Sequence, residues 1–170
     1  MGGRVARRCI CVLGLLVSAA MAHAAAPATQ NAASATIVHP LSVAKVKDMD
    51  FGWVTAITAG TAVLEPNADT FSTTGGVAPV GGSPHSAEFA GAASGGAVVV
   101  IKIPKQPITV TRVGGTETLT VSKFTLQGQS KRALAKADSF RFRVGATLNL
   151  PTLPTPGTYV GQFDVTVQYP

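Results

Sequence analysis

The stretch FRFRVGATLNL, residues 140–150, decides the fold of this 170-residue chain. Its apolar residues stand on alternate positions, and arginine, threonine and asparagine fill most of the positions between them. A period of two residues is that of a β-strand with one buried face. Helical spacing of apolar residues is almost absent along the rest of the chain. The sequence therefore predicts an all-β protein in which this segment is a core strand.

The end of the chain, GQFDVTVQYP (161–170), shows the same alternation. Phe163, Val165, Val167 and Tyr169 share one face, so we expect a second strand here that pairs with residues 140–150. The link between the two runs, PTLPTPG, is too rich in proline for a two-residue hairpin. It suits a wide loop or a crossing between sheets.

Shorter apolar runs indicate further strands, bounded by turn residues. Val113, Gly114 and Gly115 favour a hairpin turn, and a register change near Ser122 favours a bulge. Residues 131–137 fit a helical turn and a plain loop equally well. The segments that we expect as strands are 61–64 before a PNAD turn, 98–103 as a central strand covered on both faces, 108–112 and 116–126. This spacing predicts an antiparallel β-sandwich, either immunoglobulin-like or pilin-like.

The first residues have the features of an export signal. MGGRVARRCICVLGLLVSAAMAHA combines a basic start, a short apolar run and a small-residue cleavage site. We expect a signal peptide over 1–24, a flexible lead-in over 25–35 and a single β-sandwich domain over 36–170. The expected location is the periplasm, the cell surface or the medium. The apolar run is about a dozen residues, whereas a spanning helix needs roughly 20, so we expect no transmembrane segment.

Charge and cysteine content exclude some functions. Three of the fourteen Lys and Arg residues lie in the leader, which leaves eleven basic against eight acidic residues in the remainder. A nucleic-acid-binding face needs a denser basic surface interleaved with aromatics, so no nucleic acid is expected. Both cysteines, Cys9 and Cys11, also lie in the leader. The domain is therefore expected to fold without a disulfide.

Residues that support catalysis are sparse. Beyond the leader the chain has His39 and His85, no cysteine, and carboxylates that stand singly apart from Asp48 and Asp50. Acid-base or nucleophilic catalysis needs groups that converge, and zinc or calcium needs more ligands than these. We expect no enzyme, no catalytic site, no metal and no cofactor. The glycine-rich stretches within 72–96 match no phosphate-binding spacing, and we interpret them as loops or bulges, with residues 72–96 as a candidate contact surface.

A basic cluster lies in the second half of the chain. Only Asp138 opposes it within its own stretch. The cluster suits acidic polysaccharide or lipid headgroups, but charges of this kind also protect strand edges, and both readings stay open. Its members are Lys131, Arg132, Lys136, Arg141 and Arg143.

Three stretches together resemble a bacterial secreted family, the domain of unknown function 4402. They are ATIVHPLSVAKVKDMDFG near the start, VGATLNLP, and PGTYVGQFDVTVQY at the end. Members of that family carry a Leu-Asn-Phe-Gly-like motif, and here Met49 and Asp50 stand at its first two positions. The resemblance implies a β fold and export, and it implies no activity.

The ending is also similar to that of chaperone-usher pilus subunits, with an alternating terminal strand, a penultimate Tyr169 and Gly157 near its start. This resemblance implies a terminal strand that a periplasmic chaperone pairs with, and an N-terminal extension that fills a neighbour's groove. The usual pilin disulfide is missing, and residues 25–35 lack large alternating side chains. The residues that it implicates are Ile37, Leu41, Val43, Gly157, Phe163, Val165, Val167 and Tyr169.

These observations favour an exported, non-enzymatic β-sandwich that works as a subunit or accessory of a surface fibre. Its expected partners are a periplasmic chaperone or sister subunits. The alternative is a stand-alone extracellular module that binds an anionic glycan or another envelope component through its end loops.

Overall fold

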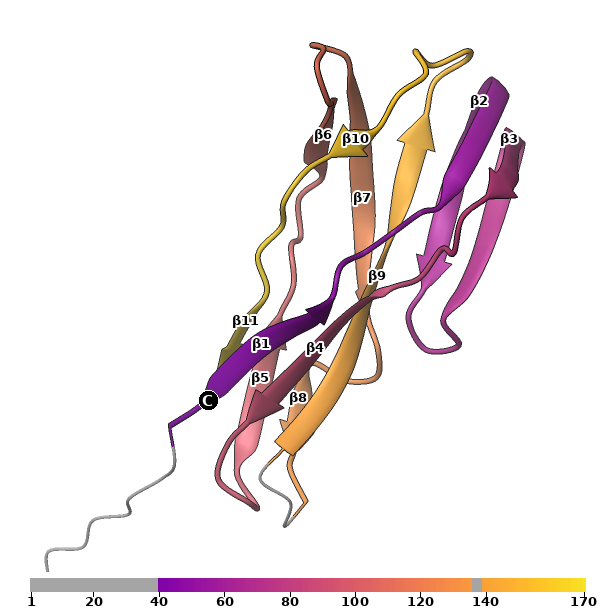
Figure 1. Cartoon of the computed structure of the whole chain (residues 1–170). Helices are drawn as coiled ribbons and strands as arrows, with labels where there is room; N and C mark the ends of the chain where they lie inside the picture. The colour runs from indigo at the N-terminus through magenta and orange to yellow at the C-terminus, as the bar shows by residue number, and fades with distance from the viewer. Residues whose placement is uncertain (1–39, 136–138) are drawn as a thin grey trace, which may run out of the picture. The chain divides into compact units, whose positions relative to one another are not determined.

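The computed structural model describes residues 40–135 and 139–170, and within them the chain forms strands and loops only (Figure 1). The predicted all-β class is confirmed. No helix in this part of the chain is long and apolar enough to cross a membrane. The expected signal peptide and lead-in, together with Ile37, His39 and Lys136, lie outside the described residues.

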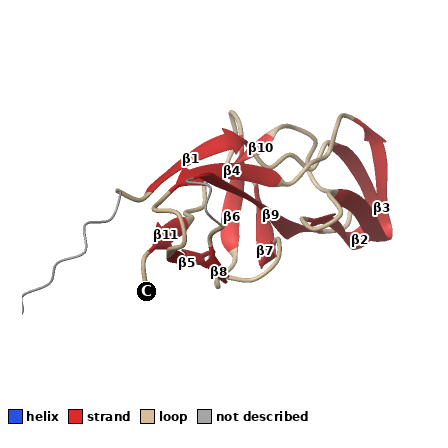
Figure 2. Ribbon diagram, turned by 90° about the horizontal axis from the view of Figure 1, so that it is seen from below, coloured by secondary structure: helices blue, strands red, loops and turns tan. Residues whose placement is uncertain are grey.

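The strands form two antiparallel sheets. They are β1 (Ser42–Lys47), β2 (Trp53–Glu65), β3 (Thr70–Gly81), β4 (Ala87–Ala92), β5 (Val98–Lys102), β6 (Ile108–Arg112), β7 (Thr118–Leu126), β8 (Lys131–Ala133), β9 (Ser139–Leu150), β10 (Tyr159–Val160) and β11 (Thr166–Gln168). The large sheet has the order β1-β4-β9-β7-β6-β10, with β2 and β3 attached through β9, and the small sheet has the order β11-β5-β8. Figure 2 shows the small sheet as a separate layer facing β1 and β4. The predicted antiparallel β-sandwich is confirmed.

The stretch FRFRVGATLNL lies in β9, which is the central strand of the large sheet and pairs with β4, β2 and β7. Along one edge its first half pairs with β4 and its second half, from Thr147, pairs with β2. Along the other edge it pairs with β7. The predicted alternation of buried and open positions holds up to Val144, and from Gly145 to Leu148 every residue is buried. The end of β2 contributes to this cover, because Leu64 and Pro66 lie against Gly145.

Gly145 marks the point at which β9 changes partner. A β-carbon there would collide with the carbonyl oxygen of Leu64 and would lie 2.7 Å from Cδ of Pro66. Only glycine lets the end of β2 approach β9 this closely. The glycine in the middle of the strand is therefore a packing requirement.

Apolar side chains fill the space between the layers in clusters. The upper cluster, between β2, β3, β6, β7 and β9, includes Ala62, Val121 and Leu148. The lower cluster joins β4 and β9 to the small sheet, and there the rings of Phe89 and Phe142 stack with centroids 5.2 Å apart. A third cluster lies beneath it under β5 and the end of the chain.

Several local predictions are confirmed. Residues 66–69 form the expected turn, β6 and β7 form the expected hairpin, and the ladder between β7 and β9 is interrupted between Ser122 and Thr125. Residues 98–102 are the middle strand of the small sheet. The two faces of this strand are not equally buried, because Val99 and Ile101 are buried whereas Val98 and Val100 are half-buried.

The expected pairing of the C-terminal run with residues 140–150 is wrong. β10 pairs with β6, and β11 pairs with β5. β4, β2 and β7 already occupy both edges of β9, so no edge is left for the end of the chain. The proline-rich link after Leu150 instead forms the predicted wide loop, which carries the chain past β7 to the far side of β6.

Two other predictions need correction. The glycine-rich residues 75–81, interpreted as loops or bulges, form no loop but belong to β3 and contain a bulge. The glycines there allow a bulge, because Gly75 has φ of 67° and three residues of β2, Ile57 to Ala59, stand opposite a single residue of β3. For residues 131–137 we expected a helical turn or a plain loop, but Lys131–Ala133 is the strand β8, which pairs with β5, and residues 136 and 137 lie outside the described residues.

Candidate strand-accepting groove

A cavity of about 1000 Å³ opens between two segments that are distant in sequence. One wall is the segment 48–56, which leads from β1 into β2, and the other is the segment 153–163 around β10. Figure 1 shows these walls in purple and yellow, on either side of β6 and β7. We call this cavity the groove.

The floor of the groove is the upper core itself. It is built by Ile108 and Val110 of β6, Leu119 and Val121 of β7, and Leu148 and Leu150 of β9. The buried members of this set keep 4–9% of their surface open. The groove is therefore narrow, and only its two walls separate these core side chains from solvent.

The first wall leaves the sheet after β1. A backbone bridge between Asp50 and His85, with N···O distances of 3.0 and 2.8 Å, is its attachment before β2 begins. The amide of Gly52, whose φ is 68°, donates to Oδ1 of Asp50 at 2.7 Å. This turn directs Met49 and Phe51 to the core, where both are half-buried. The family-like motif thus builds a wall of the groove.

Asp48 and Asp50 are exposed. A period of two residues predicts that Trp53 shares a face with Met49 and Phe51, but this is wrong, because Trp53 is 70% exposed. The turn at Gly52 reverses the alternation between Phe51 and Trp53.

The second wall is held to β6 by few contacts. Tyr159 and Val160 pair with Arg112 and Thr111, and the amide of Val113 donates to the carbonyl of Thr158 at 2.8 Å. Residues 161–165 belong to no strand. Within the described residues, β10 has β6 on one side and no strand on the other. Its free edge therefore offers unpaired backbone groups beside an apolar floor.

An ion pair fixes the start of this wall. Arg112 donates from Nε and Nη2 to the two carboxylate oxygens of Glu117 at 2.7 and 3.1 Å. The hydrogen bond from Arg112 lowers the pKa of Glu117 to about 2. Gly157 lies against the arginine, and a β-carbon there would be 2.7 Å from Cδ of Arg112. The glycine implicated by the pilin resemblance therefore makes room for this ion pair.

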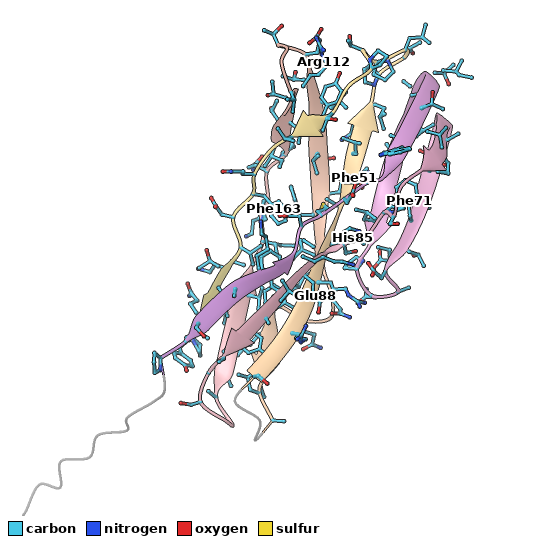
Figure 3. All side chains as sticks on the ribbon, in the orientation of Figure 1. Phe51, Phe71, His85, Glu88, Arg112 and Phe163 are labelled. Carbon is cyan, nitrogen blue, oxygen red and sulfur yellow. The ribbon has the colours of Figure 1, made fainter. Side chains whose placement is uncertain are left out.

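The other residues implicated in strand pairing lie lower in the sandwich. Phe163 lines the groove and contacts the rings of Phe89 and Phe124, with centroids 6.4 and 5.2 Å away (Figure 3). Val165 and Val167 pack on the lower cluster.

At the bottom, the hydroxyl of Tyr169 accepts a hydrogen bond from the amide of Ser94 at 3.3 Å, and Leu41 joins the same third cluster. Val43 is exposed on β1. The structure thus brings the C-terminal set together along one strand path, with Leu41 at its lower end.

The predicted basic cluster is engaged in internal contacts. Arg141 pairs with Glu88 at 2.8 Å, and Arg143 lies 4.0 Å from Asp69. Arg132 donates to the carbonyls of Gln129, Gln127 and Arg141 and lies 5.8 Å from the centre of the Phe142 ring. Burial lowers the pKa of Arg132. Of the members that the structure describes, Lys131 is the one for which we find no such contact.

The described residues contain no cluster of three or more His, Cys, Asp or Glu side chains that could hold a metal. The ring nitrogen Nδ1 of His85 lies 2.6 Å from the carbonyl oxygen of Ser83. Together with the backbone bridge to Asp50, this contact gives His85 a structural role in the first wall.

Sequence reasoning missed an exposed aromatic residue at the mouth of the groove. Trp53 lies over Gly81, where a β-carbon would be 3.0 Å from Cε3 of the indole. The ring is thereby supported on one side while most of its surface is open. Ile57 and Val80, on the same hairpin, are 70% and 62% exposed. Gly81 was the available signal, because the absence of a side chain there leaves room for the ring.

The fold and the groove define a class of protein, an antiparallel β-sandwich with a narrow groove along one side of its core. The family model of DUF4402, a domain of unknown function, matches residues 41–169, so the chain belongs to this family. No curated protein and no solved structure matches the chain. The family resemblance read from the sequence is confirmed.

Proposed function

We propose that the protein is an exported, non-enzymatic subunit or accessory of a surface fibre, and that its groove receives an extended strand from another chain. The observation that carries this proposal is the groove, in which core side chains form the floor and the free edge of β10 forms one side. Strand addition uses these two features, since backbone hydrogen bonds provide affinity and alternate side chains fill apolar positions.

The size of the groove also supports a peptide as its occupant. A volume of about 1000 Å³ is at the upper limit of the usual range for small-molecule sites. Because the walls nearly close over the floor, an entering strand has to move them apart. The second wall is suited to such movement, since β10 is two residues long and no strand follows it before Thr166.

The proposed donor is the segment that precedes β1 in a sister subunit. The sequence alternation would place Ala33, Ala35, Ile37 and Leu41 on one face if this segment were inserted as an extended strand, with His39 interrupting the apolar series. Leu41 already packs on the third cluster of its own domain. We therefore assign Ile37 as the main side chain that enters the neighbour's groove.

A peptide-binding experiment tests the proposal. A chain shortened to residues 40–170 is titrated with a peptide of residues 25–45, and binding is followed through Trp53, the single tryptophan of the protein and a residue of the groove lining. We expect a change in its fluorescence and a cooperative urea transition that the shortened chain lacks alone. The matched control is the same peptide with Ile37→Asp, which should not bind.

A monomer of residues 25–170 that unfolds cooperatively, scatters no light and ignores the peptide would contradict the proposal. The terminal strand would then be an internal strand of a complete sandwich.

The exposed indole of Trp53 favours a second candidate function. An aromatic ring that is supported on one side and open on the other can stack on the apolar face of a sugar, with the exposed carboxylate of Asp50 nearby in sequence as a hydrogen-bond acceptor. The protein would then be a stand-alone glycan-binding module. Quenching of the Trp53 fluorescence by envelope polysaccharide, with no response to the 25–45 peptide, would favour this function over the first.

A further inference from the structure

β3 is a long edge strand without the charges that the edge strands β1 and β8 carry. Within the described residues it pairs with β2 alone, so one of its edges is free. No charged residue occurs in Thr70–Gly81. By contrast, β1 carries Lys45 and Lys47, and β8 carries Lys131 and Arg132. Soluble proteins usually protect exposed edges with charges, because an unprotected edge pairs with other strands.

The first part of β3 is regular enough to pair. Residues 70–74 match residues 61–65 of β2 without a shift in register. Thr70, Ser72 and Thr74 are exposed, whereas the residues between them are half-buried. Beyond this part, Gly75 begins the bulge and Pro79 has no amide hydrogen to donate. The available ladder is therefore five residues, with Ser72 at its centre.

We propose that residues 70–74 pair antiparallel with the same residues of a second copy of this chain, with Ser72 opposite Ser72 across a two-fold axis. The sheets of the two copies then form one continuous sheet. This interface is separate from the groove, because β3 and β10 lie at opposite margins of the large sheet (Figure 1). It goes beyond the proposed function, and it does not depend on it.

Two properties of the edge select a second copy as the occupant. Two copies of one strand can pair about a two-fold axis, because each copy then offers the same backbone donors and acceptors to the other. Without the leader the chain has eleven basic and eight acidic residues, a net charge of +3, so copies repel each other except where charge is absent. The uncharged edge is such a place. Threonines that face each other across strands add hydrogen bonds, as Thr61 and Thr74 do within the hairpin at 2.7 Å.

Charge substitutions at the centre of the ladder test the proposal. Sedimentation velocity of the full chain is compared with that of Ser72→Lys and Ser72→Glu. We expect a concentration-dependent dimer for the wild type. Each variant should raise the dimer dissociation constant by about tenfold or more, because two like charges then face each other. A mixture of the two variants should restore a dimer that contains one of each.

Matched variants separate this interface from the groove. Ala44→Lys adds the same charge to the β1 edge and should leave the dimer unchanged. Ile37→Asp removes the proposed donor strand and should also leave it unchanged. Circular dichroism in the far ultraviolet checks that all variants are folded.

The proposal is overturned if the wild type stays monomeric, if Ser72→Lys dimerises like the wild type, or if the mixture forms no dimer. Loss of all association in Ile37→Asp would likewise overturn it. That last result would leave the groove proposal standing.

Discussion

At Gly145, β9 exchanges one neighbouring strand for another, and the absence of a side chain makes the exchange possible. We expect Gly145→Ala to lower the free energy of unfolding by about 1–3 kcal/mol or more, because the added methyl meets backbone and proline ring atoms that cannot move freely. Urea unfolding measures the loss.

Gly114→Asn is the control for this substitution. Gly114 has φ of 73° and nothing within 4 Å of the β-carbon position, and asparagine tolerates this conformation. An equal loss of stability in both variants would show that backbone conformation, and not the approach of β2, determines the effect at Gly145.

The pair Arg112–Glu117 makes stability depend on pH. The folded pKa of Glu117 is about 2, below its usual value of 4.5, so the carboxylate binds fewer protons in the folded state. Its contribution is complete above pH 4.5 and is lost as the pH falls towards 2. We expect the wild type to have a higher urea midpoint than Glu117→Gln at neutral pH, and the two midpoints to converge in acid. A difference that persists at pH 2 would assign the effect to something other than this charge.

The sequence pattern predicted which positions are buried, but it did not predict which neighbours they pack against. The alternation in β9 was legible because one face meets the core. The roles of Gly145 and Gly157 could not be predicted from the sequence. Each glycine makes room for a residue that is distant in sequence, Leu64 for Gly145 and Arg112 for Gly157.

At the scale of the elements, the strands were predictable and their neighbours were not. Alternation in the last ten residues shows that the segment has a buried face, and it contains no information on which strand lies beside it. We expected the C-terminal segment to pair with β9, but both edges of β9 are occupied by β4, β2 and β7. The groove was beyond prediction for the same reason, because its walls come from segments about a hundred residues apart.

β8 illustrates how a short strand is held in place by one side chain. Arg132 donates to three backbone carbonyls and covers the Phe142 ring. We expect Arg132→Ala to cost about 1–3 kcal/mol of stability, because three backbone carbonyls lose a charged donor and the buried Phe142 ring loses its cover. Arg132→Lys should recover little, since an ammonium group cannot reproduce the planar fork.

Lys131→Ala is the matched control in the same strand. It removes an exposed charge and should change the urea midpoint little. If binding to an anionic polysaccharide falls equally in Lys131→Ala and in a folded Arg132 variant, the basic cluster has a binding role besides the structural one.

At the scale of the whole molecule, the groove predicts that a donor strand fused to the same chain will stabilise the folded domain. Residues 25–41 are appended after Pro170 through a flexible linker of about ten residues. We expect a higher thermal midpoint and less binding of a hydrophobic dye, since the floor of the groove becomes covered. The same extension with Ile37→Asp is the control, and equal midpoints for the two extended chains would argue against strand insertion.

The position of β9 near the end of the chain also sets the order in which the sheet is completed during synthesis. Gly60 pairs with Leu150, and Ala87 pairs with Val144, so β2 and β4 emerge long before the strand that joins them. The β2–β3 and β6–β7 hairpins form from local contacts, but neither has a layer to pack on until residue 150 is made. A growing chain therefore remains without a closed core for most of its synthesis, and the apolar faces of its early strands stay exposed until β9 is made.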